Sequence, residues 1–384
     1  MELQTFIEVG VAALVKSVLL AVVLLTAFAY MTLAERKVVA WMQVRIGPNR
    51  VGPFGFFQPV ADGLKLFFKE ELIPSDADRA IFVLAPIITV IPALVILAVV
   101  PFGPPINVCV PTAFTSPSWT WTCYDVPLVV ADINVGLLYI LSVASIAVYG
   151  IVLAGWSSNN KYAMLGGLRS SAQMVSYEIA LGLSIVGPIL IAGSMSVQDI
   201  TLSQTRLWNV VLQPIGAAVF LIAVLAEVNR APFDMPEAEQ ELTAGYHTEY
   251  SGMKFALFFM AEYIKMVAVS AIGTALFFGG YLGPFLNEVS PWVIEKIQMG
   301  GWVFENVAVG TWLAGLLGLF YFSAKTIFFL FCMLWIRATL PRLRYDQLMR
   351  FGWKVMLPLA LANVVVTALT FAIYCKDKVS WLCS

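Results

Sequence analysis

Long, uninterrupted apolar runs constrain the fold of this sequence more than any other feature. Eight of them reach the roughly 20 residues that an α-helix needs to cross a bilayer. They are expected near Val11–Leu33, Ile81–Pro101, Val126–Ala154, Arg169–Ala192, Asn209–Val228, Phe255–Tyr281, Ala308–Ile336 and Phe351–Tyr374. Transmembrane β-strands alternate apolar and polar residues with period two, and these runs do not. The sequence therefore predicts an all-α, polytopic integral membrane protein with eight transmembrane helices.

The charge content excludes two broad classes of protein. Charged residues make up 12% of the chain, against about 25% in a typical soluble domain, and the mean hydropathy is +0.84. A water-soluble enzyme is excluded on this ground. The 23 Lys and Arg balance 24 Asp and Glu. Nucleic acid is not expected as a partner, because there is no basic excess to neutralise its phosphates.

The distribution of Lys and Arg predicts the orientation of the chain in the membrane. With the N-terminus outside, 16 of the 23 basic residues fall in inner loops and 5 on the outer side, and Lys265 and Lys325 lie within spans. The positive-inside rule then places both termini outside. We expect one membrane domain, residues 1–384, with its functional loops 34–79, 230–254 and 337–354 on the inner side.

The cysteines agree with this orientation. Cys109 and Cys123 share the first outer loop, and Cys375 and Cys383 share the outer tail. An oxidising exterior favours disulfides, so a Cys109–Cys123 bridge is expected, and a Cys375–Cys383 bridge is a second candidate. Crossed pairings and free thiols both stay open. No metal site is expected, because CxxC spacing is missing and His247 has no second ligand nearby in the sequence.

The long inner loop from residue 34 to residue 79 contains an amphipathic segment. After Pro59, a good first helical residue, the apolar residues Val60, Leu64, Phe67 and Phe68 follow helical spacing, while Asp62 and two lysines occupy the opposite face. This pattern predicts a short interfacial helix. Such a helix either anchors the chain at the membrane surface or roofs a cavity with its apolar face, and we favour the roof.

Ionisable residues inside the spans are costly and mark functional sites. Glu178 and Glu262 lie roughly 13 and 12 Å from the inner ends of their spans, and Glu227 lies at the inner edge of its own span. Lys265 and Lys325 are candidate ion-pair partners for these acids. The predicted polar path therefore opens inward without crossing the membrane. Mutual neutralisation between helices, such as a Glu262–Lys265 pair, is the structural alternative.

Two further inner loops carry unusual charge. Five acids, from Asp234 to Glu249, fall within sixteen positions directly after Glu227, on the side where basic residues usually dominate. We expect a concave acidic surface there. In the last inner loop, Arg342, Arg344 and Asp346 are expected to form a docking surface for another subunit, although attraction to lipid head groups alone would also explain the charge.

Three inner-face segments, Ala34–Glu71, Ala226–Tyr263 and Arg337–Lys354, resemble the quinone-site membrane subunit of NADH:quinone oxidoreductase, respiratory complex I. Members of this family occur in bacteria and in mitochondria. The resemblance covers nearly the whole chain, except the outer loop and the tail that carry cysteines. It implies a quinone chamber framed by Glu35, Arg36, Arg45, Asp62, Phe233 and Asp234. It also implies a proton relay through Glu178, Glu227, Glu237, Glu239, Glu241 and Glu262.

The resemblance further implies how such a protein works in its complex. It holds no redox cofactor, and the isolated chain is expected to be inactive. Quinone is the substrate, whereas NADH, FMN and the iron–sulfur clusters belong to partner subunits. The expected partners are the terminal iron–sulfur subunit, a quinone-facing hydrophilic subunit, small membrane subunits, antiporter-like subunits and lipids. The cysteine-bearing outer segments and the extra length favour a bacterial plasma membrane over the mitochondrial inner membrane.

Three other functions stay open at this level. The chain could be the membrane anchor of a related energy-converting hydrogenase, although the stretch GPNRVGPFGFFQPVADGLKL favours a quinone substrate. It could be an independent cation or proton transporter, although no internal repeat is visible and the outer half carries few charges. A purely structural scaffold would require the intramembrane acids to be dispensable.

Overall fold

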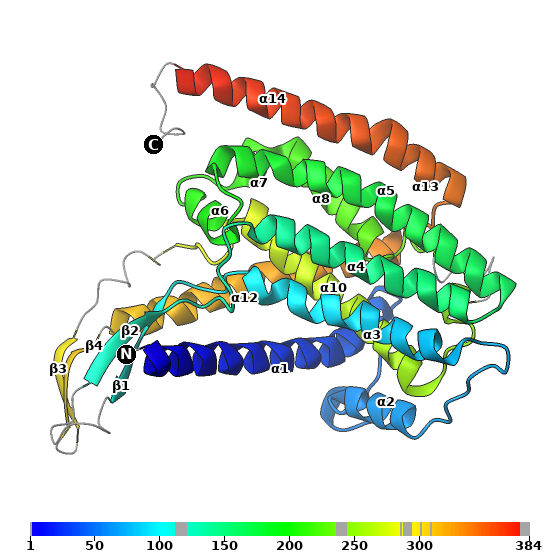
Figure 1. The fold of residues 1–384 in the computed structure, drawn as a ribbon, viewed down its shortest axis with the longest axis horizontal. Coiled ribbons are helices and arrows are strands. Elements are labelled where there is room, and N and C mark those ends of the chain that lie inside the picture. The colour runs from blue at the N-terminus through cyan, green and yellow to red at the C-terminus, as the bar shows by residue number, and fades with distance from the viewer. Residues whose placement is uncertain are drawn as a thin grey trace.

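The architecture is taken from a computed structural model. It describes residues 2–111, 121–235, 244–284, 286, 294–299, 302–307 and 309–376. Helices dominate, and the long ones run side by side as a bundle (Figure 1). At one end of the bundle lie the short helices α2 and α13, which we call the α2 end, and at the other lie two β-hairpins, which we call the hairpin end (Figure 1).

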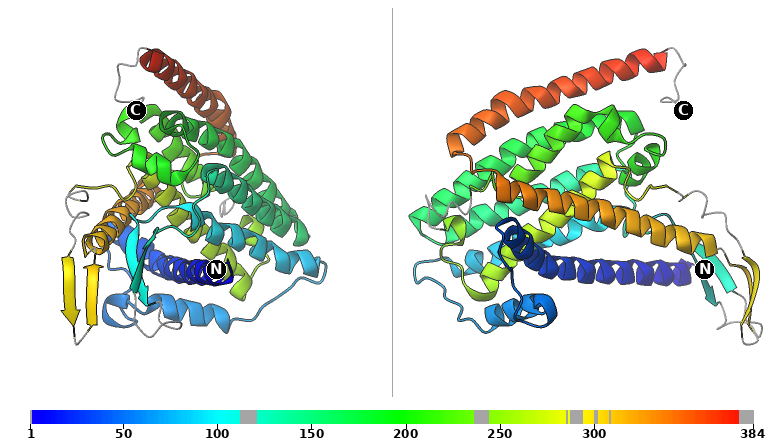
Figure 2. Two further views of the ribbon diagram at one scale, coloured as in Figure 1. Left: turned by 60° about the vertical axis from the view of Figure 1, so that its left-hand side comes forward. Right: turned by 180° about the vertical axis from the view of Figure 1, so that it is seen from behind.

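Seven helical segments are long and apolar enough to cross a membrane. They belong to α1 (Glu2–Met42), α3 (Arg79–Val95) with η2 (Ile96–Val99), α4 (Gly136–Ser157), α5 (Lys161–Ala192), α10 (Gly252–Phe277), α12 (Val309–Thr339), and α13 (Tyr345–Phe351) with η4 (Gly352–Met356) and α14 (Leu357–Lys376). In both views of Figure 2, α1 and α14 lie on opposite flanks of the bundle. The expectation of a multi-pass helical protein is thus confirmed for seven of the eight spans.

The eighth expected span, 209–228, is shorter than expected. It is divided into α7 (Asn209–Leu212) and α8 (Pro214–Glu227). The 14 residues of α8 give roughly 21 Å, less than the thickness of a bilayer core. Nine of them are buried by the rest of the chain. Most of α8 is therefore packed against protein, while Ile215 and Leu221 are exposed.

The first inner loop begins later than expected. Helix α1 continues nine residues beyond the predicted end at Leu33, to Met42, so Glu35 and Arg36 lie on a rigid helix. Helix α2 (Gln58–Phe67) confirms the short helix expected after Pro59. It is held against α1 by the Arg36–Asp62 ion pair at 2.6 Å, and Lys37 of α1 donates a hydrogen bond to the carbonyl of Phe54 in the segment that leads into α2.

These contacts turn α2 differently from the expectation. Its Asp62 side faces α1, and Asp62, Gly63 and Leu66 line a groove between α1, α2 and α10. Val60 and Leu64 are exposed. The helix does cover a cavity, with a mixed face that contains Phe67 of the predicted apolar stripe together with Asp62 and Lys65. The reason is that the ion pair to α1 fixes the rotation of the helix. The rest of the stripe, Val60, Leu64 and Phe68, is exposed and left for lipid or a partner.

Two β-hairpins interrupt the all-α expectation at the hairpin end. Strand β1 (Ile106–Pro111) pairs antiparallel with β2 (Trp121–Val126), and β3 (Ile294–Met299) pairs with β4 (Trp302–Val307). The start of α1 and the last turn of α14 lie at this same end (Figure 1). The β1–β2 register sets Cys109 opposite Cys123. The Cys109–Cys123 disulfide itself stays a prediction, because the structure does not describe those side chains. The Cys375–Cys383 disulfide also stays a prediction, because Cys383 lies in residues 377–384, outside the described residues.

Close backbone packing connects the bundle to the loop at the α2 end. A Cβ atom at Gly166 of α5 would lie 2.7 Å from the Cα of Gly245 and 2.9 Å from the amide nitrogen of Tyr246. These atoms belong to η3 (Gly245–His247), a short helical turn between α8 and α10. Only glycine allows η3 to pack this closely on α5, and this contact positions His247.

Replacing Gly166 with alanine should therefore move η3 away from α5. We expect Gly166→Ala to lower the stability of the assembled protein by about 1–3 kcal/mol, the usual cost of overpacking, and to lower the midpoint temperature of thermal inactivation. Gly182→Ala on the same helix is the control, because its nearest neighbour would lie 3.9 Å away. Equal midpoints for the two variants would contradict this account.

Candidate functional site

A large cavity opens at the α2 end of the bundle. Its volume is about 770 Å³, within the range of small-molecule sites. The end of α1 and the segment after it, η3, α10 and the end of α12 form its walls. The polar and charged side chains in these walls are Glu35, Arg36, Gln43, Arg45, Arg230, His247, Tyr263 and Arg337. We call this cavity the chamber.

Buried charges form the inner wall of the chamber. The Arg230 guanidinium binds Glu35 through Nη1, at 2.9 Å from Oε1 and 3.1 Å from Oε2. Arg337 of α12 also pairs with Glu35. Glu35 and Arg230 are each only 6% exposed. Burial at this level is tolerated because each charge has an opposite charge in contact.

Arg230 also connects the chamber to the interior of the bundle. Its Nε lies 2.5 Å from Oε1 of Glu262, and its guanidinium carbon lies 4.4 Å from the centre of the Tyr263 ring. The residue directly follows the left-handed Asn229 (φ 57°) and precedes the cis peptide Ala231–Pro232. This turn after α8 directs Arg230 inward. We call Glu35, Arg230, Glu262 and Arg337 the charged cluster.

Sequence reasoning counted Arg230 only as a loop charge. The available signal was its position, three residues after an intramembrane acid and directly before a bend marked by Pro232. A basic residue there can fold back onto the acids of the neighbouring helices.

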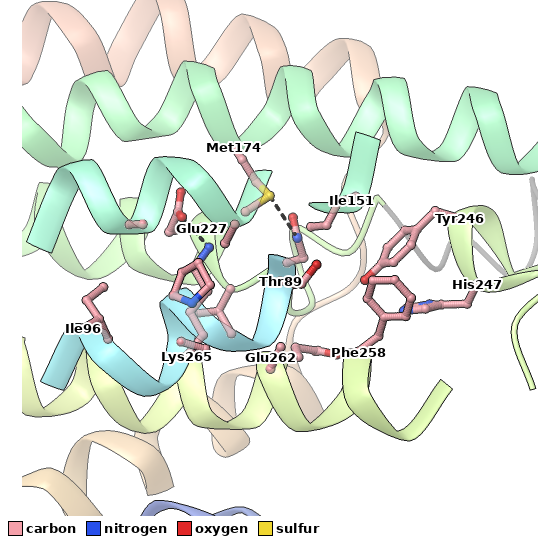
Figure 3. A pocket seen from close by; sticks show the side chains of 17 residues that line it. Thr89, Ile96, Ile151, Met174, Glu227, Tyr246, His247, Phe258, Glu262 and Lys265 are labelled. Carbon is pink, nitrogen blue, oxygen red and sulfur yellow. Dashed lines mark hydrogen bonds and ion pairs between the residues drawn. The ribbon is translucent and has the colours of Figure 1, made fainter. Parts of the chain in front are cut away.

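Two small cavities continue from the charged cluster into the bundle. The first, of about 40 Å³, is lined by His247, Glu262, Glu227 and Lys265 among others (Figure 3). The second, of about 30 Å³, is lined by Glu227, Lys265 and Glu178 among others. Glu227 and Lys265 line both cavities, so Glu262, Glu227 and Glu178 border two neighbouring cavities, and we call this row of acids the route.

The pairing along this route differs from the alternative in which Glu262 pairs with Lys265. Lys265 lies 2.5 Å from Glu227 of α8, whereas Glu262 pairs with Arg230. Ser145 of α4 donates a hydrogen bond to Glu178 of α5. The acids on α5, α8 and α10 therefore each have a partner from another element, and these polar contacts hold the elements together.

Lys325 is not an ion-pair partner for an acid in the described structure. Its ammonium donates to the carbonyls of Phe278, Gly280 and Leu282 at 2.7, 2.9 and 2.6 Å, and lies 4.7 Å from the centre of the Trp208 ring. Helix α10 ends at Phe277, where Gly279 and Gly280 take left-handed conformations. These carbonyls lie beyond the end of the helix, where no intrahelical amide is available to them. The Lys325 ammonium compensates their partial negative charge.

The remaining chamber candidates lie at its rim or outside it. Arg45 lines the chamber and its Nε donates to Gln43 at 2.7 Å. Asp62 lies in the neighbouring groove between α1, α2 and α10, which has a volume of about 460 Å³. Arg36, Phe255 and Phe259 line both the groove and the chamber.

Phe233 and Asp234 are absent from the walls of the described cavities. The ring of Phe233 is buried, with its centre 5.7 Å from that of Tyr177, and its carbonyl accepts a hydrogen bond from Gln173 at 2.7 Å. Asp234 is partly buried beside it. Glu237, Glu239 and Glu241 fall in 236–243, outside the described residues, and their role in a relay stays a prediction.

The expected docking residues lie at the α2 end, between α12 and α14. Arg344 Nε lies 3.2 Å from Asp346 Oδ2, and the two side chains are 76% and 63% exposed. Arg342 is partly buried and approaches the sulfur of Met235. The exposed pair is available to a partner.

His247 is a site residue that sequence reasoning missed. It is 5% exposed and lies among the rings of Tyr246, Phe255, Phe258 and Phe259. Burial lowers the pKa of His247 to about 3, so the imidazole is neutral at physiological pH. Sequence reasoning considered His247 as a possible metal ligand and gave no sign of this burial, because a single histidine in a polar loop carries no pattern.

Comparison with known proteins decides the family. A family model described as NADH dehydrogenase matches residues 15–368. The first of two NADH-quinone oxidoreductase H subunits of Geobacter metallireducens is 48% identical over 354 residues, which cover 92% of this chain and 94% of the relative. The corresponding H subunit of Thermomicrobium roseum is 47% identical, over 90% and 92% of the two chains. This chain belongs to the H-subunit family of NADH-quinone oxidoreductase.

The chain is therefore a membrane subunit of respiratory complex I, and other subunits of that complex are its partners. Cofactors of the complex are carried by those other subunits. In the part of this chain that the structure describes, no group of three or more His, Cys, Asp or Glu side chains could hold a metal ion.

Removing the Arg230 guanidinium, which Glu35 and Glu262 share, should strongly destabilise the protein. Arg230→Met would leave Glu35 with Arg337 alone and Glu262 facing a thioether. We expect about 3–5 kcal/mol of destabilisation, the usual result of breaking a buried pair, measured as loss of assembled complex from membranes. Arg206→Met, at an exposed position of the hairpin end, is the control. Normal assembly of the Arg230 variant would show that the cluster does not hold the helices.

His247 predicts a dependence of stability on pH. The unfolded chain protonates this imidazole near pH 6.5, whereas the folded chain does so near pH 3. Unfolding therefore takes up a proton in this window, and stability falls as the pH drops below 6.5. Between pH 7.5 and 5.5 the loss should be about 1.4 kcal/mol. We expect the midpoint of thermal inactivation to fall less in His247→Gln than in the unmutated complex over this range. Equal falls in both would contradict the assignment.

Proposed function

We propose that the chamber holds the quinone head group and that the charged cluster couples quinone reduction to proton movement. The observation that carries this proposal is the position of the Glu35–Arg230–Glu262 cluster. One side of it forms the chamber wall, and the other side leads to Glu227, Lys265 and Glu178.

The two larger cavities fit the two parts of a quinone. The groove between α1, α2 and α10 is lined mostly by apolar side chains, including Phe28, Phe67, Leu257 and Met260, which suit an isoprenoid tail. The chamber is lined by cations and hydrogen-bonding groups, which suit a polar head that becomes anionic. Because Arg36, Phe255 and Phe259 line both, a molecule could pass from the groove into the chamber.

Charge balance suggests how the chamber could influence the acids. Glu35 and Glu262 offset Arg230 and Arg337, and Glu227 offsets Lys265. Quinone reduction consumes two protons and transiently makes an anion. An anion beside Arg230 would compete with Glu35 and Glu262 for that guanidinium, and coupled carboxylates change their proton occupancy together. The chain itself would perform no redox step, and the electrons would come from iron–sulfur clusters fed by NADH and FMN in partner subunits.

The proposed route is a transducer and not a complete pore. Towards the hairpin end, Lys16 and Lys325 donate to backbone carbonyls, and Asp132 accepts a hydrogen bond from Ser196 at 3.4 Å. Such lysines are fixed by their hydrogen bonds and do not continue the acidic route. This favours coupling to antiporter-like partner subunits over an independent transporter.

The same arrangement suggests where partners bind. The α2 end would face the inner side of a bacterial plasma membrane, where the terminal iron–sulfur subunit and the quinone-facing hydrophilic subunit would close the chamber. Exposed Arg344 and Asp346 would contribute to that contact. A hydrogenase anchor would not need the chamber, and its polar wall favours the quinone function.

Two substitutions separate the chamber from the relay. Asp62→Asn should lower NADH:quinone reduction about fivefold, because it removes an ion pair worth about 1 kcal/mol that positions α2. Glu262→Gln should lower the protons translocated per NADH oxidised more than the rate of reduction, because it removes a titratable group from the route. Both are measured in membrane vesicles, with assembly checked by NADH:ferricyanide activity.

Asp199→Asn at the hairpin end is the control, because Asp199 contacts Ser194 in a surface turn far from the chamber. Full proton translocation with Glu262→Gln would remove the relay from the proposal. Normal reduction with Asp62→Asn would remove α2 from the quinone site.

A further inference from the structure

Two buried polar atoms belong to side chains that line the same small cavity. His247 Nε2 and Glu227 Oε2 are both buried and have no hydrogen-bond partner within the described chain. Both residues line the 40 Å³ cavity, with His247 at one end and Glu227 towards the other (Figure 3). An unsatisfied buried polar atom costs about 1–3 kcal/mol, so each of these atoms calls for a ligand.

The size and walls of the cavity limit what that ligand can be. A volume of about 40 Å³ has room for two or three water molecules. Glu262, Asn229 and Thr89 offer further polar groups in the wall, and Ile151 and Phe258 close it with apolar surface. Water needs two to four polar partners to remain in a buried site, and this cavity provides them. An organic ligand would not fit.

His247 also lines the chamber. Among the described residues, it is the one side chain that lines both this cavity and the chamber. Its neutral imidazole carries one donor and one acceptor nitrogen. The four aromatic rings around it hold its plane, and the packing of η3 on Gly166 holds its backbone.

We propose that His247 and Glu227 hold a short chain of water molecules between them, and that His247 is the polar link from the chamber to the acids of the bundle. This inference rests on the proposed coupling function and adds a residue and a water site to it. The charged cluster then supplies the electrostatic contact, and the His247 water chain supplies the hydrogen-bonded path. His247 is a positioning residue here, because it acts through the water it binds.

The test replaces the imidazole with an apolar ring of similar shape. His247→Phe should fit among the four aromatic neighbours while removing both ring nitrogens. We expect the coupled rate of NADH-driven proton translocation to fall roughly tenfold, the effect of one lost hydrogen bond in the path, with NADH:ferricyanide activity unchanged. His247→Gln, which keeps a donor and an acceptor, should restore most of the translocation.

Tyr250→Phe is the matched control. It removes one buried hydroxyl from the segment just after η3, where Tyr250 donates to the carbonyl of Phe82 at 3.3 Å, and Tyr250 lines neither cavity. It should leave translocation unchanged. A purely structural histidine would give normal translocation in His247→Phe, or would fail equally in the Phe and Gln variants, and either result overturns the inference.

The Glu262→Gln variant separates this inference from the proposed function. Loss of translocation with Glu262→Gln but not with His247→Phe would leave the relay in place and remove His247 from it. Normal translocation in both variants would overturn the relay and the His247 link together.

Discussion

One guanidinium shared between two carboxylates fixes the geometry on which the rest of this molecule depends. Arg230 lies between Glu35 of α1 and Glu262 of α10, and Arg337 of α12 joins the same carboxylate of α1. Taking these charges out of water is costly, and their mutual contacts and the Tyr263 ring offset that cost. Helices that are far apart in the sequence must therefore meet at this point for any of the charges to be tolerated.

The same constraint explains why the backbone is irregular just beyond the ends of α8 and α10. Helix α8 stops after 14 residues, turns through the left-handed Asn229, and presents Arg230 to the chamber. At the other end of the bundle, α10 stops at Phe277 and Lys325 occupies its freed carbonyls. Irregular backbone inside a membrane protein is tolerated where protein groups satisfy it. Here each irregularity carries a polar group of the site or is stabilised by one.

Much of the site could be anticipated from the sequence, because intramembrane acids are rare and expensive. Glu178, Glu227 and Glu262 are visible at once as exceptions in apolar runs, and the groove helix α2 follows from its spacing after Pro59. Their partners could not be anticipated. The i, i+3 spacing of Glu262 and Lys265 suggested a local ion pair. Instead, Glu262 pairs with Arg230 and Lys265 pairs with Glu227 of α8. The face that α2 turns to the groove likewise contains Asp62, which binds α1, and Phe67 as the one member of the apolar stripe.

The sequence by itself determined the class of protein, the approximate spans and the acids that matter, since these follow from hydropathy, length and the cost of charge in lipid. Tertiary structure alone decided that Arg230 is the centre of the cluster, that Lys325 caps a helix, and that His247 lies between two cavities. The physical reason is that a charge or a polar atom in a low-dielectric interior is compensated by whichever partner the packing brings within hydrogen-bond distance. Such distances depend on how helices cross, and no local pattern in the chain encodes that.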